Sequence, residues 1–248
     1  MIKRAASLFT DVLFRPDRAI AGQFRQDAPT GPAAILFIAY AAAGALVSSL
    51  LPPAFIPDVP AEAFGQSYAV YLGVELPAGL LLNVLVAAAL PWGADFFAAG
   101  RAGPRVLLSI AALMIYLLSF VAAADAPALG VVLALAPLAA ALAAFLSRRD
   151  KFPPYFRLLL AISAPGLALA PVELLAIAAG SKPLYEAAMV VSAFWAIWLL
   201  VRAIKSRDCP GTARAAAAAV LVILLFGGMF YGLALLLPGN IGPLLMLI

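Results

Sequence analysis

The stretch Pro32–Leu51, PAAILFIAYAAAGALVSSLL, contains no charged side chain. It lies inside a longer charge-free segment that runs from Ala28 to Pro57. An α-helix rises about 1.5 Å per residue, so about 20 residues are needed to cross about 30 Å of hydrocarbon. The stretch therefore predicts a membrane-spanning helix that begins at Pro32 and ends near Leu51.

Six further apolar stretches follow along the chain. They predict spans near Ser67–Trp92, Val106–Ala124, Pro127–Ser147, Leu158–Ala179, Pro183–Ala203 and Ala215–Leu237. The composition agrees, because 66% of the residues are hydrophobic and 11% charged, with a mean hydropathy of +1.08. Soluble domains have roughly 45–50% apolar and 25% charged residues. We therefore expect an all-α fold: a polytopic transmembrane helical bundle of about seven spans.

The basic residues predict an orientation for this bundle. All but one of the sixteen fall on the same side: Lys3, Arg4, Arg15, Arg18, Arg25, Arg101, Arg105, Arg148, Arg149, Lys151, Arg157, Arg202, Lys205, Arg207 and Arg214. Only Lys182 falls on the other side. Short loops rich in Lys and Arg stay in the cytoplasm, which predicts a cytoplasmic N-terminus and a periplasmic C-terminus. The richness in Ala, Pro and Arg is typical of a GC-rich bacterium, so we expect the bacterial inner membrane.

Residues 1–30 differ in character from the rest. At helical spacing, one face carries the apolar residues Ile2, Ala5, Phe9, Val12 and Leu13, and another carries Lys3, Arg4, Ser7 and Asp11. This pattern predicts an amphipathic helix in the cytoplasmic interface. Pro16 is expected to end that helix or to begin a second one. We thus expect a cytoplasmic-face amphipathic segment over 1–30 and a single transmembrane helical bundle over 31–248.

The histidine and cysteine content and the placement of the charged residues argue against several classes of function. The chain has no histidine and one cysteine, Cys209, so it lacks the usual general base and the usual metal ligands. We expect no enzyme activity, no metal and no cofactor. The net charge of the chain is +4. The basic residues are predicted at the ends of the helices, where they contact lipid headgroups, so we expect no nucleic-acid partner.

Three polar residues inside the spans form a candidate intramembrane site: Glu75, Glu173 and Asn83. A buried carboxylate in lipid is costly, which makes Glu75 and Glu173 functional candidates. Both are predicted toward the external ends of their spans, where two close acids can share a proton. A structural or interfacial role for the two acids is the alternative, and Asn83 fits an interhelical hydrogen bond.

A second candidate set consists of cations outside the spans. These residues are expected to contact lipid headgroups or a partner: Lys3, Arg4, Arg15, Arg18, Arg148, Arg149 and Lys151. Cations at this position attract anionic lipids. The partners that we expect are the lipid bilayer itself, its anionic lipids and other membrane proteins.

Two segments resemble the bacterial branch of the Yip-domain family, the Ypt/Rab-GTPase-interacting type of integral membrane proteins. The first is Phe9–Pro16, FTDVLFRP, which resembles the family's entry segment. The second begins at Val191–Trp198, VSAFWAIW, and continues through Arg202 into the Ala-rich stretch after Thr212. Gly100–Arg105, GRAGPR, is a weaker similarity. The resemblance implies a non-enzymatic membrane protein; family members typically have five spans, whereas this pattern has seven.

Three functions remain open at this point. The resemblance favours a multi-pass inner-membrane protein that organises or scaffolds the membrane. The acids Glu75 and Glu173 favour a small transporter or channel. The nearly charge-free external loops and the Ala-rich spans favour an accessory subunit or assembly factor of a larger membrane complex.

Overall fold

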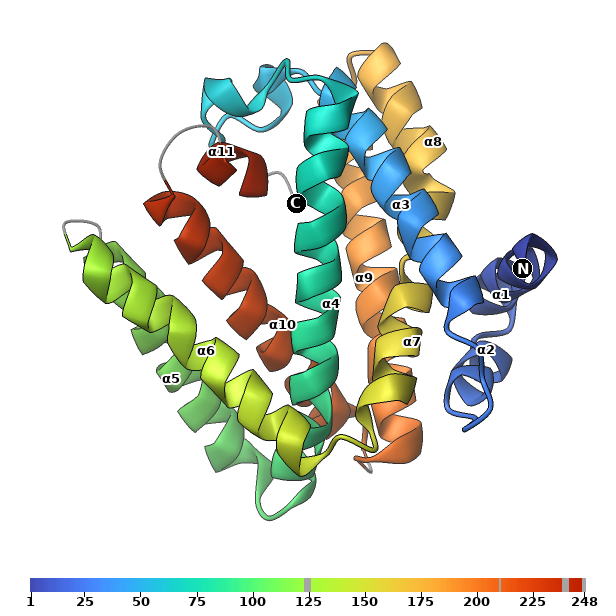
Figure 1. Ribbon diagram of the computed structural model, residues 1–248, viewed down its shortest axis with the longest axis vertical. Coiled ribbons are helices and arrows are strands. Elements are labelled where there is room, and N and C mark those ends of the chain that lie inside the picture. Colours follow the sequence, from blue (N-terminus) through green and yellow to red (C-terminus); the bar gives the residue numbers. More distant parts are fainter. Residues whose placement is uncertain (123–125, 210, 238–240, 247–248) are drawn as a thin grey trace. The chain divides into compact units, whose positions relative to one another are not determined.

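A computed structural model describes residues 1–122, 126–209, 211–237 and 241–246, and these residues form helices and short connections (Figure 1). The helices are α1 (Ile2–Phe14), α2 (Pro16–Gln23), α3 (Gly31–Leu50), η1 (Pro53–Phe55), η2 (Ala61–Ala63), α4 (Tyr68–Ala98), α5 (Ala102–Ala122), α6 (Pro127–Ser147), α7 (Phe152–Ile162), α8 (Ala164–Ala178), α9 (Lys182–Arg207), α10 (Thr212–Leu236) and α11 (Ile241–Leu245). The predicted all-α fold is confirmed.

Six segments among the described residues are long and apolar enough to cross a membrane. They are α3, α4, Ala102–Phe120 of α5, Phe152–Ala178, α9 and α10. The helix α6 has 21 residues, of which Leu135–Ser147 form a further apolar stretch. This agrees with a polytopic bundle of about seven spans. The predicted end of the third span at Ala124 lies outside the described residues.

The chain divides into two compact units. Unit 1 consists of Met1–Leu80 and Pro154–Leu199, and unit 2 consists of Leu81–Pro153 and Leu200–Met246. Both α4 and α9 therefore contribute one part to each unit. The single bundle expected over 31–248 stays a prediction.

In unit 1, α3 packs along α8, and one end is closed by an apolar cluster. Phe55 of η1 and Tyr185 of α9 meet there with ring centroids 5.6 Å apart. Phe64, which follows η2, and Ala176 of α8 are buried in the same cluster. The connection between α3 and α4 thus packs against α8 and α9 at one end of this unit.

The amphipathic segment belongs to unit 1. Pro16 separates α1 from α2, as expected, because proline has no N–H to continue α1 and its fixed φ suits a first helical turn. The helix α1 packs against α3 and α8 and buries Ala5 and Val12. Ile2, which was expected on the same face, is 78% exposed because it is the first residue of the helix.

In unit 2, α10 packs against α5, α6 and α11. Ala215, Ala218 and Ala219 are fully buried, so the Ala-rich stretch after Thr212 forms a packing face of α10. Small residues permit this close approach where lipid supplies no hydrophobic drive for helix association. By contrast, α5 exposes large apolar side chains such as Leu107 and Ile115, which suits a helix surrounded by lipid.

The fifth predicted span is longer than expected and is divided. Its helices run from Phe152 to Ala178 and are interrupted at Ser163, where the hydroxyl donates to the carbonyl O of Leu160 at 2.6 Å. Pro165 has no N–H, so it removes a hydrogen bond from the helical ladder at this point. The loop expected over Arg148–Arg157 is correspondingly shorter, since Pro153 and Pro154 lie in the first turn of α7.

Candidate functional site

Glu75 and Glu173 come together in unit 1. Glu75 lies in α4, Glu173 lies in α8, and the two partly buried carboxyl groups are close enough to interact electrostatically. Two phenols share this environment: Tyr40 of α3 interacts with both acids, and Tyr185 of α9 interacts with Glu173. Four helices therefore each contribute one titratable side chain to a single acidic cluster.

Glycines make room for this cluster. The carboxyl group of Glu75 lies directly against Gly44 of α3, where an added Cβ would be 2.8 Å from Cδ of Glu75. The ring of Tyr40 lies against Gly166 of α8 in the same manner, and Ser192 Oγ would be 3.3 Å from a Cβ there. Because real Cβ atoms essentially never lie within 3.0 Å of another heavy atom, a larger residue at Gly44 or Gly166 would force Glu75 or Tyr40 to shift.

The third residue of the predicted trio is separate. Asn83 lies in the part of α4 that belongs to unit 2, two helical turns or about 12 Å beyond Glu75 along the same helix. Asn83 is partly buried and interacts with another group. The sequence thus identified the two acids that meet in unit 1, whereas Asn83 belongs to unit 2.

The acidic cluster can hold a proton or a cation. Two neighbouring carboxylates repel each other when both are ionised, and a shared proton or a bound cation removes that repulsion. Phenol hydroxyls such as that of Tyr185 can donate to the remaining carboxylate. Among the described residues, no group of three or more His, Cys, Asp and Glu side chains has the arrangement of a metal site.

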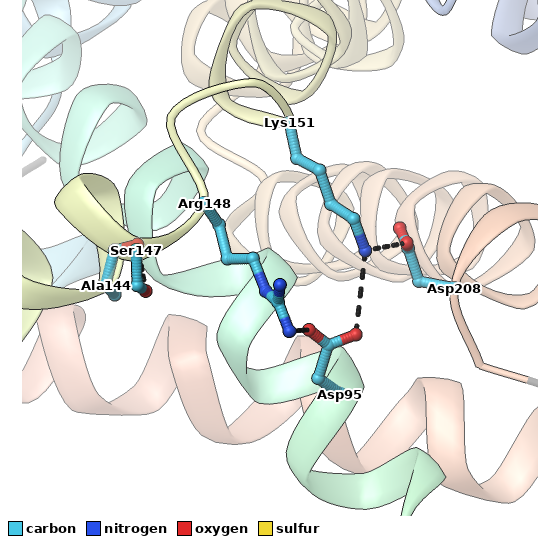
Figure 2. Close-up of polar contacts among 6 residues, drawn as sticks. All are labelled: Asp95, Ala144, Ser147, Arg148, Lys151 and Asp208. Atoms are coloured by element: carbon cyan, nitrogen blue, oxygen red, sulfur yellow. Dashed lines mark hydrogen bonds and ion pairs between the residues drawn. The ribbon is translucent and has the colours of Figure 1, made fainter.

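A second polar cluster lies in unit 2 and consists of two cations and two carboxylates (Figure 2). Lys151 Nζ lies 2.6 Å from Oδ1 of Asp208 and 3.5 Å from Oδ1 of Asp95. Arg148 Nη2 lies 2.8 Å from Oδ2 of Asp95. The four residues come from α4, from the connection between α6 and α7, and from the residue after α9, so the cluster joins three segments of the chain.

Lys151 is the centre of this ionic cluster. Partial burial disfavours its charged form, but the hydrogen bond and the charge of Asp208, together with Asp95, outweigh burial and raise the pKa of Lys151 above its ordinary value. We expected Arg148 and Lys151 to contact headgroups, and the structure places both in ion pairs within the protein. Arg149 between them is exposed.

Two more arginines of unit 2 bind the carbonyl end of α4. Arg214 donates from Nη1 to the carbonyl O of Ala98 at 2.9 Å and from Nη2 to that of Gly100 at 3.2 Å. Arg105 donates to the carbonyl O of Phe96 and lies over the Phe96 ring. Cations are favourable at a helix C-terminus, where carbonyl groups lack partners within the helix.

Arg157 holds the amphipathic segment in unit 1. It is buried in α7, and its guanidinium donates from Nε and Nη2 to the carbonyl O of Gln23 at 3.1 and 2.8 Å. A further bond from Nη2 reaches the carbonyl O of Arg25 at 2.9 Å. The C-terminal end of α2 therefore receives the donors that a helix end needs. The rings of Phe24 and Tyr155 pack edge to face beside this contact, with centroids 5.2 Å apart.

Sequence reasoning missed the partners in each of these clusters. Tyr40 and Tyr185 gave no signal, because a tyrosine in a span is ordinary. Asp95 and Asp208 did give one, since each is an acid among basic residues at the end of a span. Arg157 was counted only as a cation that sets orientation, whereas its Nε and Nη2 donate to main-chain carbonyl groups within unit 1.

The fold defines a multi-pass, all-helical membrane protein. No protein-family model matches this chain, no curated protein matches it, and no solved structure matches it.

Proposed function

We propose that this chain is a non-enzymatic protein of the bacterial inner membrane that organises the lipids around it and scaffolds neighbouring membrane proteins. The observation that carries the proposal is the contact of Arg157 with Gln23 and Arg25. It makes the amphipathic segment a fixed part of unit 1 instead of a loosely attached anchor. We call α1 and α2 together the platform.

The platform has the side chains that a lipid interface favours. Its cations Lys3, Arg4, Arg15 and Arg18 are exposed, and so are the apolar residues Ile2 and Phe14 at the two ends of α1. Apolar side chains of an interfacial helix enter the acyl boundary while its cations remain at the headgroups. Each Lys or Arg near an anionic surface contributes about 1 kcal/mol of attraction.

The proposal includes an orientation and a family type. The platform is cytoplasmic, the C-terminus is periplasmic, and the protein is of the Yip-domain type that Phe9–Pro16 and Val191–Trp198 resemble. Packing within each unit supports the orientation. The segment between the first two predicted spans, which this orientation makes external, meets the start of α9 at Phe55 and Tyr185, and the predicted internal segments meet at Asp95 and Lys151.

Reconstitution into giant vesicles with a fluorescent anionic lipid tests the proposal. The protein is expected to concentrate anionic lipid around itself, and a Lys3→Gln/Arg15→Gln variant is expected to lose most of that enrichment. The matched control is Arg202→Gln/Lys205→Gln, which removes the same charge from α9. Equal enrichment in the wild type and in the platform variant would contradict the proposal.

The acidic cluster favours a second candidate function, the passage of a proton or a small cation. The observation behind it is that Glu75 and Glu173, 98 positions apart, interact across α4 and α8. Proteoliposomes loaded with a pH-sensitive dye measure this directly. If flux occurs and is lost in both Glu75→Gln and Glu173→Gln but kept in Glu186→Gln, an exposed acid paired with Lys182, the chain is a transporter. The organising function predicts no flux in the wild type.

A further inference from the structure

Polar side chains of α8 and α9 meet at two levels in unit 1. On α8, Glu173 lies seven residues after Gly166, and on α9, Ser192 lies seven residues after Tyr185. Seven residues span about 10 Å and return to nearly the same face of a helix. Tyr185 interacts with Glu173, and Ser192 Oγ lies beside Gly166, so the two helices match at both levels.

The helices α3 and α4 add two further polar side chains to this arrangement. Tyr40 of α3 lies at the level of Ser192, since both side chains lie beside Gly166. Glu75 of α4 lies against Gly44, which is one turn further along α3 than Tyr40. The four residues of the acidic cluster and Ser192 thus form a line about two helical turns long, which we call the polar column.

The side chains of the polar column lack partners. Among the described residues, none of the five has a hydrogen bond or an ion pair. Lys182 is the basic residue nearest to Tyr185 along α9, but it pairs with Glu186 at 3.6 Å. Tyr185 is only 5% exposed, so water does not replace the missing partner freely. Unpaired carboxylates and hydroxyls are costly inside a membrane, and a bound ligand would remove that cost.

A ligand can reach these oxygens. The described side-chain atoms that are both sealed from solvent and without a hydrogen-bond partner are Gln23 Oε1, Asp95 Oδ2 and Tyr116 Oη. The oxygens of Glu75, Glu173, Tyr185 and Ser192 are not among them, although they have no partner either. Each of these oxygens therefore keeps some accessible surface.

The chemistry of the polar column selects a positively charged ligand with hydrogen-bond donors. Its two carboxylates and three hydroxyl groups can all accept hydrogen bonds. An anion would be repelled by the two acids. A divalent metal ion takes about six or more oxygen ligands, and the column supplies only two carboxylates. A primary ammonium group carries three N–H donors and a single charge, and it needs no fixed coordination geometry.

One end of the polar column adjoins an apolar cluster. Tyr185 belongs to both, because it is buried in the cluster together with Val47, Leu51 and Phe55. The ring centroids of Phe55 and Tyr185 lie 5.6 Å apart. Aromatic faces attract cations, and the aliphatic side chains of the cluster suit a short alkyl group. The neighbouring groups therefore favour an amine with a small apolar part over a bare inorganic cation.

We propose that the polar column binds a small protonated primary amine, whose ammonium group donates hydrogen bonds to Glu75, Glu173 and Tyr185 and whose alkyl group lies toward Phe55. The inference goes beyond the proposed function and does not rest on it, because binding here requires neither the platform nor passage of the ligand. It gives the second candidate function a substrate of stated chemistry.

Isothermal titration calorimetry of the full-length protein in detergent at neutral pH tests the inference. The probe is propylammonium chloride, whose amine is protonated at this pH as a lysine side chain is. We expect saturable binding of one propylammonium per chain. Tetramethylammonium carries the same charge but no N–H, so it should bind at least about tenfold more weakly, which corresponds to about 1.4 kcal/mol. Sodium and potassium chloride are the inorganic probes and should not displace propylammonium at equal concentration.

Three variants and one control assign the contacts. Glu75→Gln and Glu173→Gln keep the size of the side chain and should each weaken propylammonium binding at least about tenfold. Tyr185→Phe removes only a hydroxyl group and should weaken binding about twofold to tenfold. Glu186→Gln is the matched control, because it removes the same charge from an exposed position next to Tyr185, and it should bind as the wild type does. Circular dichroism checks that each variant is folded.

Four results would overturn the inference. They are no saturable binding of propylammonium, equal binding of tetramethylammonium, displacement by sodium or potassium at equal concentration, and unchanged binding in the folded Glu75→Gln and Glu173→Gln variants. The other proposals fail separately. Binding without flux in proteoliposomes would refute the second candidate function alone, and an unchanged lipid composition around the platform variant would refute the organising function alone.

Discussion

Arg157 in α7 holds the carbonyl O of Gln23, 134 positions earlier in the chain, with two hydrogen bonds of 3.1 and 2.8 Å. Arginine is rarely buried, because removing its charge from water is costly unless its donors are satisfied. Here the carbonyl groups of Gln23 and Arg25 accept hydrogen bonds from its Nε and Nη2, and the guanidinium in turn supplies donors that this helix end lacks. One residue thus connects a predicted interfacial segment to a predicted span.

Replacement of Arg157 should release the platform. Arg157→Leu removes three hydrogen bonds and leaves the carbonyl groups of Gln23 and Arg25 without them, which we expect to cost about 2–4 kcal/mol. Hydrogen exchange should show faster exchange in α2 while α10 keeps its protection. The exposed Arg149→Leu is the control and should change neither helix. Unchanged exchange in α2 would show that other contacts hold the platform.

Gly44 should tolerate no larger side chain while Glu75 occupies its present place. Gly44→Ala puts a Cβ into the Glu75 carboxyl group, with an expected cost of about 1–3 kcal/mol in thermal unfolding experiments. Gly73→Ala, on the same helix as Glu75, meets no described atom within 4 Å and should stabilise the protein by about 0.5–1 kcal/mol.

A double-mutant cycle identifies the cause of the Gly44 effect. If the loss comes from collision with Glu75, the Gly44→Ala/Glu75→Ala pair should recover most of it. If the stability losses of the two single variants simply add in the double variant, the strain at Gly44 comes from another part of the packing of α3.

Lys151 should stabilise the fold in a pH-dependent manner. Its pKa in the folded protein is raised above the ordinary 10.5 by Asp208 and Asp95, although burial opposes them. A raised pKa contributes stability that is fully present below pH 10.5 and is lost as pH rises through the folded value. Unfolding in detergent should therefore show Lys151→Gln less stable than the wild type by about 1–2 kcal/mol near neutral pH.

The same comparison at high pH tests the ionic origin of this effect. The difference between the wild type and Lys151→Gln should shrink as pH rises above 10.5 and through the raised pKa of the folded protein, because Lys151 loses its proton first in the unfolded chain and then in the folded one. Arg148→Gln removes a neighbouring cation that stays charged throughout this range, so its effect should not shrink in the same way. A constant Lys151 difference would mean that packing, not charge, explains it.

Cys209 should react slowly until the protein unfolds. It is the only cysteine of the chain and is 1% exposed. Burial raises the pKa of its thiol and Asp208 acts in the same direction, while Arg214 opposes them. Because the thiolate is the nucleophile, maleimide labelling should be slow in the folded protein and fast in denaturant. A Cys209→Ser/Arg149→Cys variant, with its cysteine at an exposed position, should label rapidly; rapid labelling of the wild type would contradict the packing after α9.

Local chemistry explains what the sequence could and could not predict. Long apolar runs identified the spans, because length and composition alone decide whether a helix can cross hydrocarbon. Pro16 marked the boundary between α1 and α2 for a similarly local reason. The pairing of Lys151 with Asp208, 57 positions away, depends on which helix ends meet, and no local pattern encodes that.

The two glutamates show the same limit within one site. Their cost in lipid marked Glu75 and Glu173 as candidates, but the glycines Gly44 and Gly166 that admit Glu75 and Tyr40 were recognisable only from packing.

Lipid analysis of protein extracted directly from bacterial membranes in polymer nanodiscs tests the central claim most directly. The account predicts that the wild type carries more anionic lipid than the bulk membrane, and that the Lys3→Gln/Arg15→Gln variant carries the bulk composition. The Arg202→Gln/Lys205→Gln control should resemble the wild type. Identical lipid around the wild type and the platform variant would contradict the claim that the platform organises the membrane.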